Sequence, residues 1–313
     1  MDTAIEQERV AAVCVTFEPD LERLRIVLSA VSGQVERVLV VDNSETEQAS
    51  KLIASAVTSE RLEYRWLGGN FGLSHAFNHG IEEALGLDCS HVLLLDQDSV
   101  VAEDMVARLL SAETQLSGSG GQPVAALGPV YTDSRAGRRS TFARFQSFPP
   151  KRLDPISQPP VFEVDMLISS GALIPRHALE TIGVLDAELF IDHIDTDWCL
   201  RAMSEGFRLV AVQSAHMEHR LGQRWARLGR FSLPVHNADR LYFMFRNSWL
   251  LYRRDYARWP WILADLRRLV VVFVLHMIAC DHRFVAFIRI LQGTRDGILG
   301  RTGKSAQGKA LSG

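Results

Sequence analysis

The chain has 313 residues, which is enough for one large α/β domain with an additional segment. Its residues are 47% hydrophobic and 23% charged, as in soluble globular proteins. Its four cysteines are widely spaced, which excludes a disulfide scaffold and predicts free thiols. The net charge is −3, and the first residues show no basic region followed by an apolar stretch, so we expect a cytoplasmic protein without a secretory signal.

The first half of the chain alternates short apolar stretches with helical patterns. We expect strands over residues 11–17, 38–42, 62–67, 91–96 and 124–131. We expect helices over residues 21–31, 49–57, 72–85 and 103–116, the first of them opened by Pro19 and Asp20. Strands and helices that alternate at this spacing predict βαβ units around a mostly parallel sheet.

The second half begins with an irregular segment. Residues 132–160 are rich in Arg, Ser and Pro, which predicts a surface loop. Strand character returns over residues 164–176 and 208–212, and a helix is expected between them over residues 195–205. These elements complete the predicted α/β domain.

The segment HVLLLDQDS at residues 91–99 is the most informative motif. A short apolar run that ends in acidic residues is typical of a buried parallel strand whose tip reaches a site. Asp96 and Asp98, one residue apart on that tip, can together reach a divalent cation such as Mg²⁺. Asp42 ends an earlier strand, and ligands of open α/β sheets bind where such strand ends meet. The alternative is that these acids are solvated or cap the next turn.

A Gly- and Asn-rich segment, GGNFGLSHAFNHG at residues 68–80, lies where a strand turns into a helix. Such a turn presents backbone N–H groups at a helix N-terminus, where negative charge is favoured. The segment is neither a Walker loop nor a GxGxxG fingerprint. Asn70 is either an N-cap or a ligand, and Asn78 is an unfavourable residue for a helix interior, which suggests a further role.

A second acidic cluster lies in LFIDHIDTDWCLRA at residues 189–202. One of Asp192, Asp195 and Asp197 is expected to cap the helix, but three acids exceed what capping needs. A carboxylate that projects from this helix start can serve as a general base.

A histidine and two arginines follow the last predicted strand. His219 is either an ordinary surface or core histidine, or a ligand of a metal ion or a diphosphate. Arg240 and Arg246 lie in HNADRLYFMFRNSWLLYRR, the start of the C-terminal part of the chain, and are placed to bind phosphate.

The chain divides into the α/β domain over residues 1–235 and a helical region over residues 236–313. Residues 240–313 carry 13 Lys and Arg against 4 Asp and Glu, a balance of +9, whereas the rest of the chain sums to −12. The longest uncharged stretch there, Leu269–Cys280, has 12 residues and is too short to span a bilayer. Aromatic and aliphatic residues mixed with arginines suit helices that lie on an anionic membrane surface. The alternative is that these helices pack on the core or pair two copies of the chain as a homodimer.

Taken together, these segments resemble the family 2 glycosyltransferases of GT-A fold, and more narrowly the bacterial rhamnosyltransferases. The resemblance covers about residues 10–255 and rests on VCVTFEPD, VVDNS, GGNFGLSHAFNHGI, LLLDQDS, SSGALI, LFIDHIDTDWCLRA, MEHRLG and DRLYFMFRN. The DQDS and IDTDWCLR forms, with the later Arg-Asn pair, favour rhamnose. The chain departs from the usual pattern at Phe77, where many members have Arg, at Ile194, where Glu is usual, and after His219, where the motif lacks Ser.

The resemblance implies a role for each motif. Thr16, Phe17 and Asp42 would bind the nucleotide, Asn70 and Asn78 would line the donor pocket, and Asp96 would hold the ribose or the diphosphate. Asp98 would bind the metal ion, with Asp96 and His219 beside it. Asp195 would take the proton from the acceptor hydroxyl, supported by Asp192 and Asp197.

The implied reaction is an inverting transfer of L-rhamnose from dTDP-rhamnose, with Mg²⁺ or Mn²⁺, to a saccharide hydroxyl on a polyprenyl lipid carrier in cell-surface polysaccharide synthesis. The enzyme would be peripheral on the inner face of the bacterial cytoplasmic membrane and would have no nucleic-acid partner. A sugar-nucleotide pyrophosphorylase is the rival enzyme, but VCVTFEPDLERL lacks the Gly-rich loop with Arg and Lys that would grip a triphosphate. A non-catalytic, membrane-associated nucleotide-sugar-binding protein is the other rival, and it would not need a base on the acceptor side.

Overall fold

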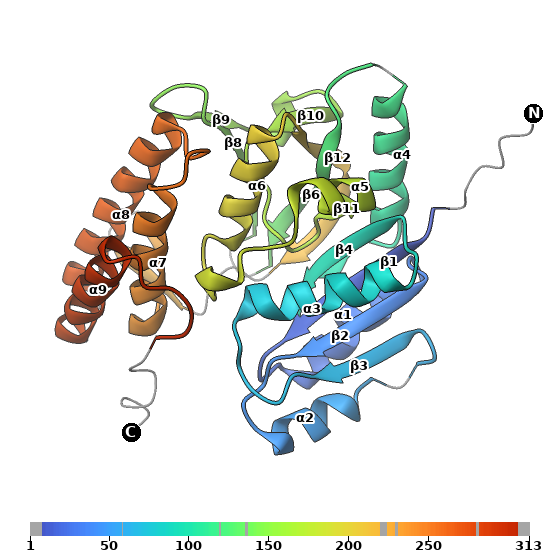
Figure 1. The fold of residues 1–313 in the computed structure, drawn as a ribbon, viewed down its shortest axis with the longest axis horizontal. Coiled ribbons are helices and arrows are strands. Elements are labelled where there is room, and N and C mark those ends of the chain that lie inside the picture. The colour runs from blue at the N-terminus through green and yellow to red at the C-terminus, as the bar shows by residue number, and fades with distance from the viewer. Residues whose placement is uncertain are drawn as a thin grey trace, which may run out of the picture.

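A ten-stranded mixed sheet forms the centre of the protein (Figure 1). The computed structural model describes residues 8–57, 59–118, 120–134, 137–219, 224–228, 231–279 and 282–305. Residues 220–223, the end of the predicted histidine motif, lie outside the described residues. The strands of the sheet follow the order β10-β12-β6-β11-β4-β1-β2-β3, with β5 paired to β12 and β7 to β6.

The elements have the following bounds. The strands of the sheet are β1 (Val10–Thr16), β2 (Arg37–Asp42), β3 (Leu62–Trp66), β4 (His91–Asp96), β5 (Val100–Val101), β6 (Val124–Asp133), β7 (Arg138–Arg139), β10 (Val161–Val164), β11 (Leu173–Pro175) and β12 (Arg208–His219). Two further antiparallel pairs are β8 (Phe142–Arg144) with β9 (Lys151–Leu153), and β13 (Arg224–Leu228) with β14 (Phe231–Val235). The helices are α1 (Leu21–Ser32), α2 (Glu47–Ala54), α3 (Leu73–Gly86), α4 (Met105–Ser117), α5 (Arg176–Ile182), α6 (Ile194–Ser204), α7 (Ala238–Leu251), α8 (Trp259–Ala279) and α9 (Arg283–Ile298).

The parallel half of the sheet brings four strand ends to one edge. β3, β2, β1 and β4 are parallel neighbours, and β1 is buried along its whole length because VAAVCVT presents apolar side chains to both faces. α1 begins after Asp20, whose carboxylate accepts hydrogen bonds from two backbone N–H groups, and it packs on one face. α3 packs on the other face at Gly80, where a Cβ would lie 2.2 Å from Val13 Cγ1. The predicted parallel sheet with flanking helices is confirmed.

The second half of the sheet carries the end of β12 to the same edge. β11 lies antiparallel between β4 and β6, and β12 is parallel to β6 with a register shift between Val212 and His216. β12 therefore extends beyond the predicted strand over residues 208–212, as far as His219. Its last residues pair with β5, so the end of β12 lies beside the turn that follows β4.

The irregular segment over residues 132–160 is more ordered than a surface loop. It contains β7 and the β8–β9 hairpin, and its apolar side chains Phe142, Phe145 and Leu153 are buried in the larger core. The expectation of a surface loop was therefore wrong for these residues, because widely spaced apolar side chains anchor short strands that show no periodicity of their own.

The three C-terminal helices, α7 to α9, lie together beside the sheet domain (Figure 1). α9 approaches α7 closely because Gly293 and Gly297 face its backbone, and a Cβ at Gly293 would lie 2.2 Å from Tyr242 O. Leu251 and Trp261 belong to the same buried cluster as the sheet residues. The helical region that begins near residue 236 thus shares its core with the domain before it. Within the described residues, no helix is long and apolar enough to cross a bilayer.

Candidate active site

Two carboxylates and an imidazole meet at the carboxyl edge of the sheet. Asp96 ends β4, Asp98 lies in the turn to β5, and His219 ends β12. One ligand atom from each lies within 4.8 Å of the others. The pairing of β5 with β12 brings the turn and His219 together although they are far apart in sequence. The predicted grouping of these three residues is therefore present in the structure.

Two buried serines hold this cluster in place. The Ser170 hydroxyl accepts a hydrogen bond from Asp96 N at 3.0 Å and donates to Ser99 Oγ at 2.7 Å. Ser99 Oγ lies 2.7 Å from His219 Nδ1, which is also 3.4 Å from Asp98 Oδ1. Such outer hydrogen bonds fix the orientation of a histidine ring that binds a metal ion. The SSGAL and DQDS segments contain these serines, but nothing in the local sequence indicates that they meet.

The charges of the cluster favour a divalent cation. Burial raises the pKa of Asp96, and the charge of Asp98 raises it further, whereas the charges of His219 and Arg240 oppose this. Burial lowers the pKa of His219, but its hydrogen bond to Asp98 and the nearby carboxylates outweigh burial and raise it. Crowded carboxylate oxygens with one imidazole are a ligand set that suits Mg²⁺ or Mn²⁺. Asp96, Asp98 and His219 would hold such an ion.

Asp195 lies near this cluster, at the start of α6. Its Oδ1 accepts a hydrogen bond from Thr196 N at 2.8 Å. Burial raises its pKa to about 6 in spite of that hydrogen bond, and the charges of Asp192 and Asp96 add to the effect. A carboxylate whose pKa is close to neutral is well suited to accept a proton. The structure thus gives Asp195 the properties expected of a general base.

Asp192 and Arg240 form an ion pair beside Asp195. Arg240 Nη2 lies 2.9 Å from Asp192 Oδ1, and Nε donates to the same oxygen at 3.0 Å. The charge of Asp192, together with those of Asp96 and Asp195, raises the pKa of Arg240, so this guanidinium faces the acidic site. Its side chain is 43% exposed, which leaves it accessible to a phosphate group.

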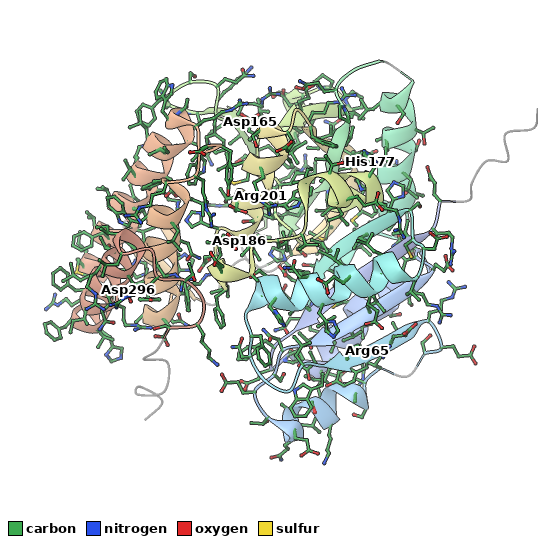
Figure 2. The ribbon with its side chains drawn as sticks, viewed as in Figure 1. Arg65, Asp165, His177, Asp186, Arg201 and Asp296 are labelled. Carbon is green, nitrogen blue, oxygen red and sulfur yellow. The ribbon has the colours of Figure 1, made fainter. Side chains whose placement is uncertain are left out.

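Three predicted site residues have other roles. Asp197 lies two positions after Asp195 and therefore on another side of α6. It is fully buried and binds Arg201, labelled in Figure 2, and Tyr256 at 2.9 and 2.6 Å. Arg246 is also fully buried, donates to the carbonyl oxygen of Leu189 at 2.9 Å and contacts other backbone carbonyls. The prediction that Arg246 binds phosphate was therefore wrong, whereas the supporting role of Asp197 stays a prediction.

Asn78 is the third of these residues. Its amide nitrogen donates to Leu185 O at 2.7 Å, and its amide oxygen accepts from Leu185 N at 2.9 Å. Both ends of the side chain are thus used to join α3 to the chain before α6. Asn78 does not line a donor pocket as predicted, and this backbone contact explains why an asparagine is present inside a helix.

Thr16 and Asp42 lie beneath the edge of the sheet and not on its surface. Both are fully buried, and Thr16 Oγ1 donates to Asp42 Oδ1 at 3.2 Å. The same carboxylate accepts hydrogen bonds from Ser44 N at 2.9 Å and from the Tyr64 hydroxyl at 2.6 Å. The predicted direct contacts with the nucleotide are thus corrected to a supporting role, because protein groups already surround these side chains.

Exposed groups form the surface above them. Phe17 is 41% exposed, and the side chain of Gln97 accepts a hydrogen bond from Phe17 N at 2.7 Å and donates one to Phe17 O at 3.2 Å. Asn70 is not the N-cap of α3, since Gly72 takes that position, and its amide oxygen accepts hydrogen bonds from Asn43 Nδ2 and Gly72 N. Phe17 and Asn70 therefore remain candidates for contact with a nucleotide sugar.

Sequence reasoning missed Gln97 and Lys304 at this surface. Gln97, between the two acids, joins the tip of β4 to that of β1. Lys304, after α9, lies 3.3 Å from both Glu45 Oε1 and Asn70 O. The DQD motif offered a signal for Gln97, whereas nothing in the sequence around Lys304 indicates that it reaches the loop before α3.

Comparison with known proteins identifies the family. The chain matches the Glycosyl transferase family 2 over residues 12–183, more than half of its length. The chain belongs to glycosyltransferase family 2. The glycosyltransferase is 27% identical over 299 residues to dTDP-rhamnosyl transferase RfbF of Shigella flexneri, covering 94% of this chain and 97% of that protein.

Solved structures share the fold of this glycosyltransferase. GalNAc-T7 with UDP, GalNAc and Mn²⁺ matches with a TM-score of 0.56 and 13% identity, over 90% of this chain and 58% of the other. TarS of S. aureus matches with a TM-score of 0.57 and 13% identity, over 93% of this chain and 49% of the other. The chain thus spans about half the length of these structures. Residues 1–349 of TarS with UDP-GlcNAc match with a TM-score of 0.54 and 13% identity, over 92% of this chain and 80% of the other. The fold is GT-A, as predicted, and the protein is a glycosyltransferase.

Proposed function

We propose that this glycosyltransferase transfers L-rhamnose from dTDP-rhamnose, with inversion, to a hydroxyl of a saccharide carried on a polyprenyl lipid. The observation that carries the sugar assignment is the similarity to a dTDP-rhamnosyl transferase along nearly the whole of both chains. The arrangement of Asp195 beside the cluster of Asp96, Asp98 and His219 supports the chemistry. A base and a cation site on one edge of the sheet are what a direct displacement of a nucleoside diphosphate requires.

Different residues of the site act on the acceptor and on the donor. Asp195 accepts the proton of the acceptor hydroxyl as that oxygen attacks the anomeric carbon. Arg240 lies on the acidic side of the site, where its guanidinium can bind a phosphate oxygen of the donor. A divalent cation, when bound, neutralises the charge of the departing diphosphate, an effect worth several kcal/mol.

The donor assignment makes a direct prediction. With Mg²⁺ present, calorimetry should show that dTDP-rhamnose binds more tightly than UDP-glucose and UDP-galactose, and transfer should occur from dTDP-rhamnose. Measuring the affinities of free dTDP and UDP under the same conditions separates the contribution of the nucleobase to donor affinity from that of the sugar. Turnover of a UDP-sugar alone would overturn the rhamnose assignment and leave the family assignment intact.

We also propose that the outer face of α8 and α9 attaches the enzyme to the cytoplasmic face of a membrane. This face is apolar, and its most exposed side chains include Trp259, Val270 and Ile278 on α8 and Phe284 on α9, each more than 60% exposed. Large apolar patches of this kind on a surface are typical of interaction sites.

The buried side of the same helices is unusually polar. Its charged and polar side chains include Asp265, His276 and Arg289, as well as Asp296, which is labelled in Figure 2 and accepts a hydrogen bond from Tyr242 at 3.0 Å. Polar groups thus share the inward side with apolar residues such as Leu269 and Ile290, while many large apolar groups face outward, which is unusual for a surface helix in water.

Charge favours an anionic lipid surface as the partner of this face. Within the described residues of α8 and α9, the exposed charged side chains are Arg267, Arg283 and Arg295, all of them basic. Each basic residue near an anionic membrane surface contributes roughly 1 kcal/mol. A saccharide on a lipid carrier would be presented at that surface.

Sedimentation with vesicles tests this attachment. The double variant Val270→Asp/Phe284→Asp removes two exposed apolar side chains and adds negative charge, so its binding to vesicles that contain anionic phosphatidylglycerol should fall by about tenfold or more. Binding of the unaltered protein should weaken at high salt. Point variants are preferred to removal of residues 256–313, which would also take away Trp261 and Asp265 from the interior.

The matched control is Ile26→Asp/Ile156→Asp, which changes two exposed apolar residues far from α8 and α9 in sequence. This control should sediment like the unaltered protein. Equal sedimentation of both double variants, or none by the unaltered protein, would contradict membrane attachment. A dimer in solution that the Val270→Asp/Phe284→Asp variant dissociates would instead assign the face to a second copy of the chain.

A further inference from the structure

The chain just before α6 has an unusual backbone conformation. Within the described residues, five residues other than glycine have a positive φ, and three of them, Phe190, Asp192 and His193, lie within four positions. Phe190 has a φ of 64° and a ψ of −62°, and Ile191 N donates to Leu189 O at 2.7 Å across it, so the chain forms a γ-turn of the rare, strained type. Strained residues persist only where surrounding contacts hold them, and they gather at functional sites.

A side chain of α7 holds this segment. Asn247 is fully buried, and its amide nitrogen donates to three main-chain carbonyl oxygens. They belong to Leu189, Ile191 and Asp192, at 2.9, 2.7 and 2.9 Å. The amide oxygen accepts from Arg246 Nε at 2.9 Å, and a guanidinium can only donate, so the orientation of the amide is determined. The three carbonyl oxygens converge on one nitrogen because the chain turns sharply between them.

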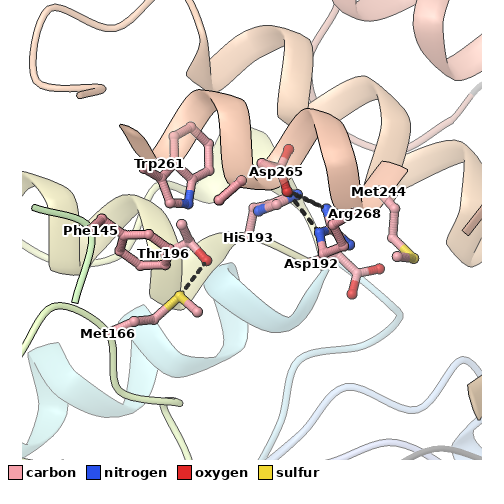
Figure 3. A pocket seen from close by; sticks show the side chains of 10 residues that line it. Phe145, Met166, Asp192, His193, Thr196, Met244, Trp261, Asp265 and Arg268 are labelled. Atoms are coloured by element: carbon pink, nitrogen blue, oxygen red, sulfur yellow. Dashed lines mark hydrogen bonds and ion pairs between the residues drawn. The ribbon is translucent and has the colours of Figure 1, made fainter. Parts of the chain in front are cut away.

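Two further contacts hold the end of the segment at His193. Its Nε2 lies 3.0 Å from Ser248 Oγ of α7 and 2.9 Å from Arg268 Nη2 of α8 (Figure 3). Ser248 directly follows Asn247, so two successive residues of α7 bind the strained segment. His193 itself has the left-handed conformation, with a φ of 63° and a ψ of 4°, and is the last residue before α6. The segment is therefore held from the side of the C-terminal helices.

The strained segment leads directly into the proposed base. His193 O accepts a hydrogen bond from Asp197 N at 2.8 Å, so the first turn of α6 starts from the left-handed residue. Asp195 is the second residue of α6, and its place in the site follows the direction in which the helix leaves His193. The main chain of Asp192, whose carboxylate also lies at the site, is bound by Asn247 directly. Asn247 thus acts on both carboxylates through the backbone.

We propose that Asn247 is a positioning residue, which holds the strained turn before α6 and thereby places Asp195 for proton transfer. The inference rests on the proposed function, because it takes Asp195 as the base. Without the amide, the carbonyl oxygens of residues 189–192 lose a shared donor, and the strained residues relax toward negative φ. The start of α6 then moves, and the carboxylate of Asp195 moves with it.

Removal of the amide tests the proposal. Asn247→Ala takes away all three donated hydrogen bonds, whereas Asn247→Ser keeps a hydroxyl that can donate to one carbonyl oxygen. The measured reaction is hydrolysis, with water in place of the acceptor hydroxyl, of whichever of dTDP-rhamnose, UDP-glucose and UDP-galactose the unaltered protein hydrolyses fastest. We expect kcat to fall by about 10- to 100-fold in Asn247→Ala and by less in Asn247→Ser, since a displacement of about 1 Å can cost about 10²-fold in rate.

Two further measurements separate positioning from a general loss of structure. The affinity for the sugar nucleotide, measured by calorimetry, should stay the same in both variants, because Asn247 holds the segment that carries the base and not the cation cluster. Hydrogen–deuterium exchange should become faster in peptides that span residues 189–195, where the carbonyl oxygens lose their donor. Peptides that span residues 91–101 should exchange as they do in the unaltered protein.

The matched control is Asn78→Ala, the same substitution at another buried asparagine. Asn78 binds Leu185 through both ends of its amide, at 2.7 and 2.9 Å, and Leu185 is not among the residues with a positive φ. Asn78→Ala should lower the melting temperature as Asn247→Ala does, because both leave buried main-chain groups without a partner. It should nevertheless leave kcat near that of the unaltered protein.

Three outcomes would contradict a positioning role for Asn247: its variants keep full kcat, their donor affinity falls enough to account for the loss, or Asn78→Ala loses as much kcat as Asn247→Ala. Asn247→Ser decides the matter if Asn247→Ala does not fold. A failure of the proposed function would be seen separately, as an Asp195→Asn variant that keeps its kcat. Full kcat in the Asn247 variants beside an impaired Asp195→Asn would remove the role of Asn247 alone.

Discussion

Replacement of Asp98 by alanine should lower the rate of transfer by about 10³-fold or more and leave the protein folded. A bound cation is expected to stabilise the leaving diphosphate by several kcal/mol, and each 1.36 kcal/mol corresponds to about a tenfold change in rate. Calorimetry with Mn²⁺ should show a matching loss of affinity for the ion. Thorough chelation of the unaltered enzyme with EDTA should abolish transfer, and added Mg²⁺ or Mn²⁺ should restore it.

The structure explains why Asp98→Ala should keep its stability. The side chain of Asp98 is 32% exposed, and the contact of this residue with Arg23 is made by the backbone carbonyl oxygen, which alanine retains. Removal of one of two crowded carboxylates also relieves repulsion with Asp96. Asp104→Ala is the matched control, since it removes an exposed acid from the same region of the chain, and it should be fully active. Full activity of the unaltered enzyme after chelation would contradict the role of a metal ion.

The grouping of Asp96, Asp98 and His219 could be predicted from the sequence because it follows from general rules. Parallel strands have their carboxyl ends at one edge, so acids that end buried strands lie near one another. His219 joined them because it lies at the end of a strand, β12. The ion itself and the catalytic role of each residue stay predictions.

Buried polar residues were the main source of error. Asn78 was predicted to line the donor pocket, but its partner Leu185 lies 107 positions away. Arg246 was predicted to bind phosphate, but it binds the carbonyl oxygen of Leu189, 57 positions away. An isolated polar residue in an apolar segment has the same appearance whether it faces a ligand or a backbone carbonyl. Only the packing of distant segments distinguishes the two, because a buried polar group must find a partner somewhere.

The composition of the C-terminal helices does not show which of their side chains are buried and which are exposed. The sequence indicates a basic, apolar region, which suits either a membrane surface or a packed interface. It does not indicate that Asp265 and Arg289 face inward while Val270 and Phe284 face outward. That division depends on where α7 lies, and it explains why charge counts alone left both alternatives open.

Asp195→Asn should lower kcat by about 10²–10⁴-fold, because asparagine keeps the size of the side chain but cannot accept the proton of the acceptor hydroxyl. The affinity for dTDP-rhamnose should change little, since Asp195 acts on the acceptor side. Steady-state kinetics with calorimetry of donor binding would separate the two effects. Asp192→Asn serves as a comparison, because it alters the neighbouring charge and the pairing with Arg240 but leaves Asp195 in place. The decrease in kcat should therefore be smaller in Asp192→Asn than in Asp195→Asn.

The pH dependence distinguishes loss of a base from loss of structure in the same variant. Burial raises the pKa of Asp195 from an ordinary 3.8 to about 6, so kcat of the unaltered enzyme should rise with pH as this group loses its proton near pH 6. A bound cation would offset the charge of Asp96 and move that rise to a lower pH. In Asp195→Asn the rise of kcat with pH should be absent.

Because the pKa of Asp195 in the folded protein lies above its pKa in the unfolded chain, this carboxyl stabilises the fold only when protonated, and its contribution is lost as pH increases from about 4 to 6. A neutral asparagine avoids that loss, so the variant should be at least as stable as the unaltered protein at pH 7. A variant that keeps more than about a tenth of kcat, or that loses activity only because it unfolds, would contradict the assignment of Asp195 as the base.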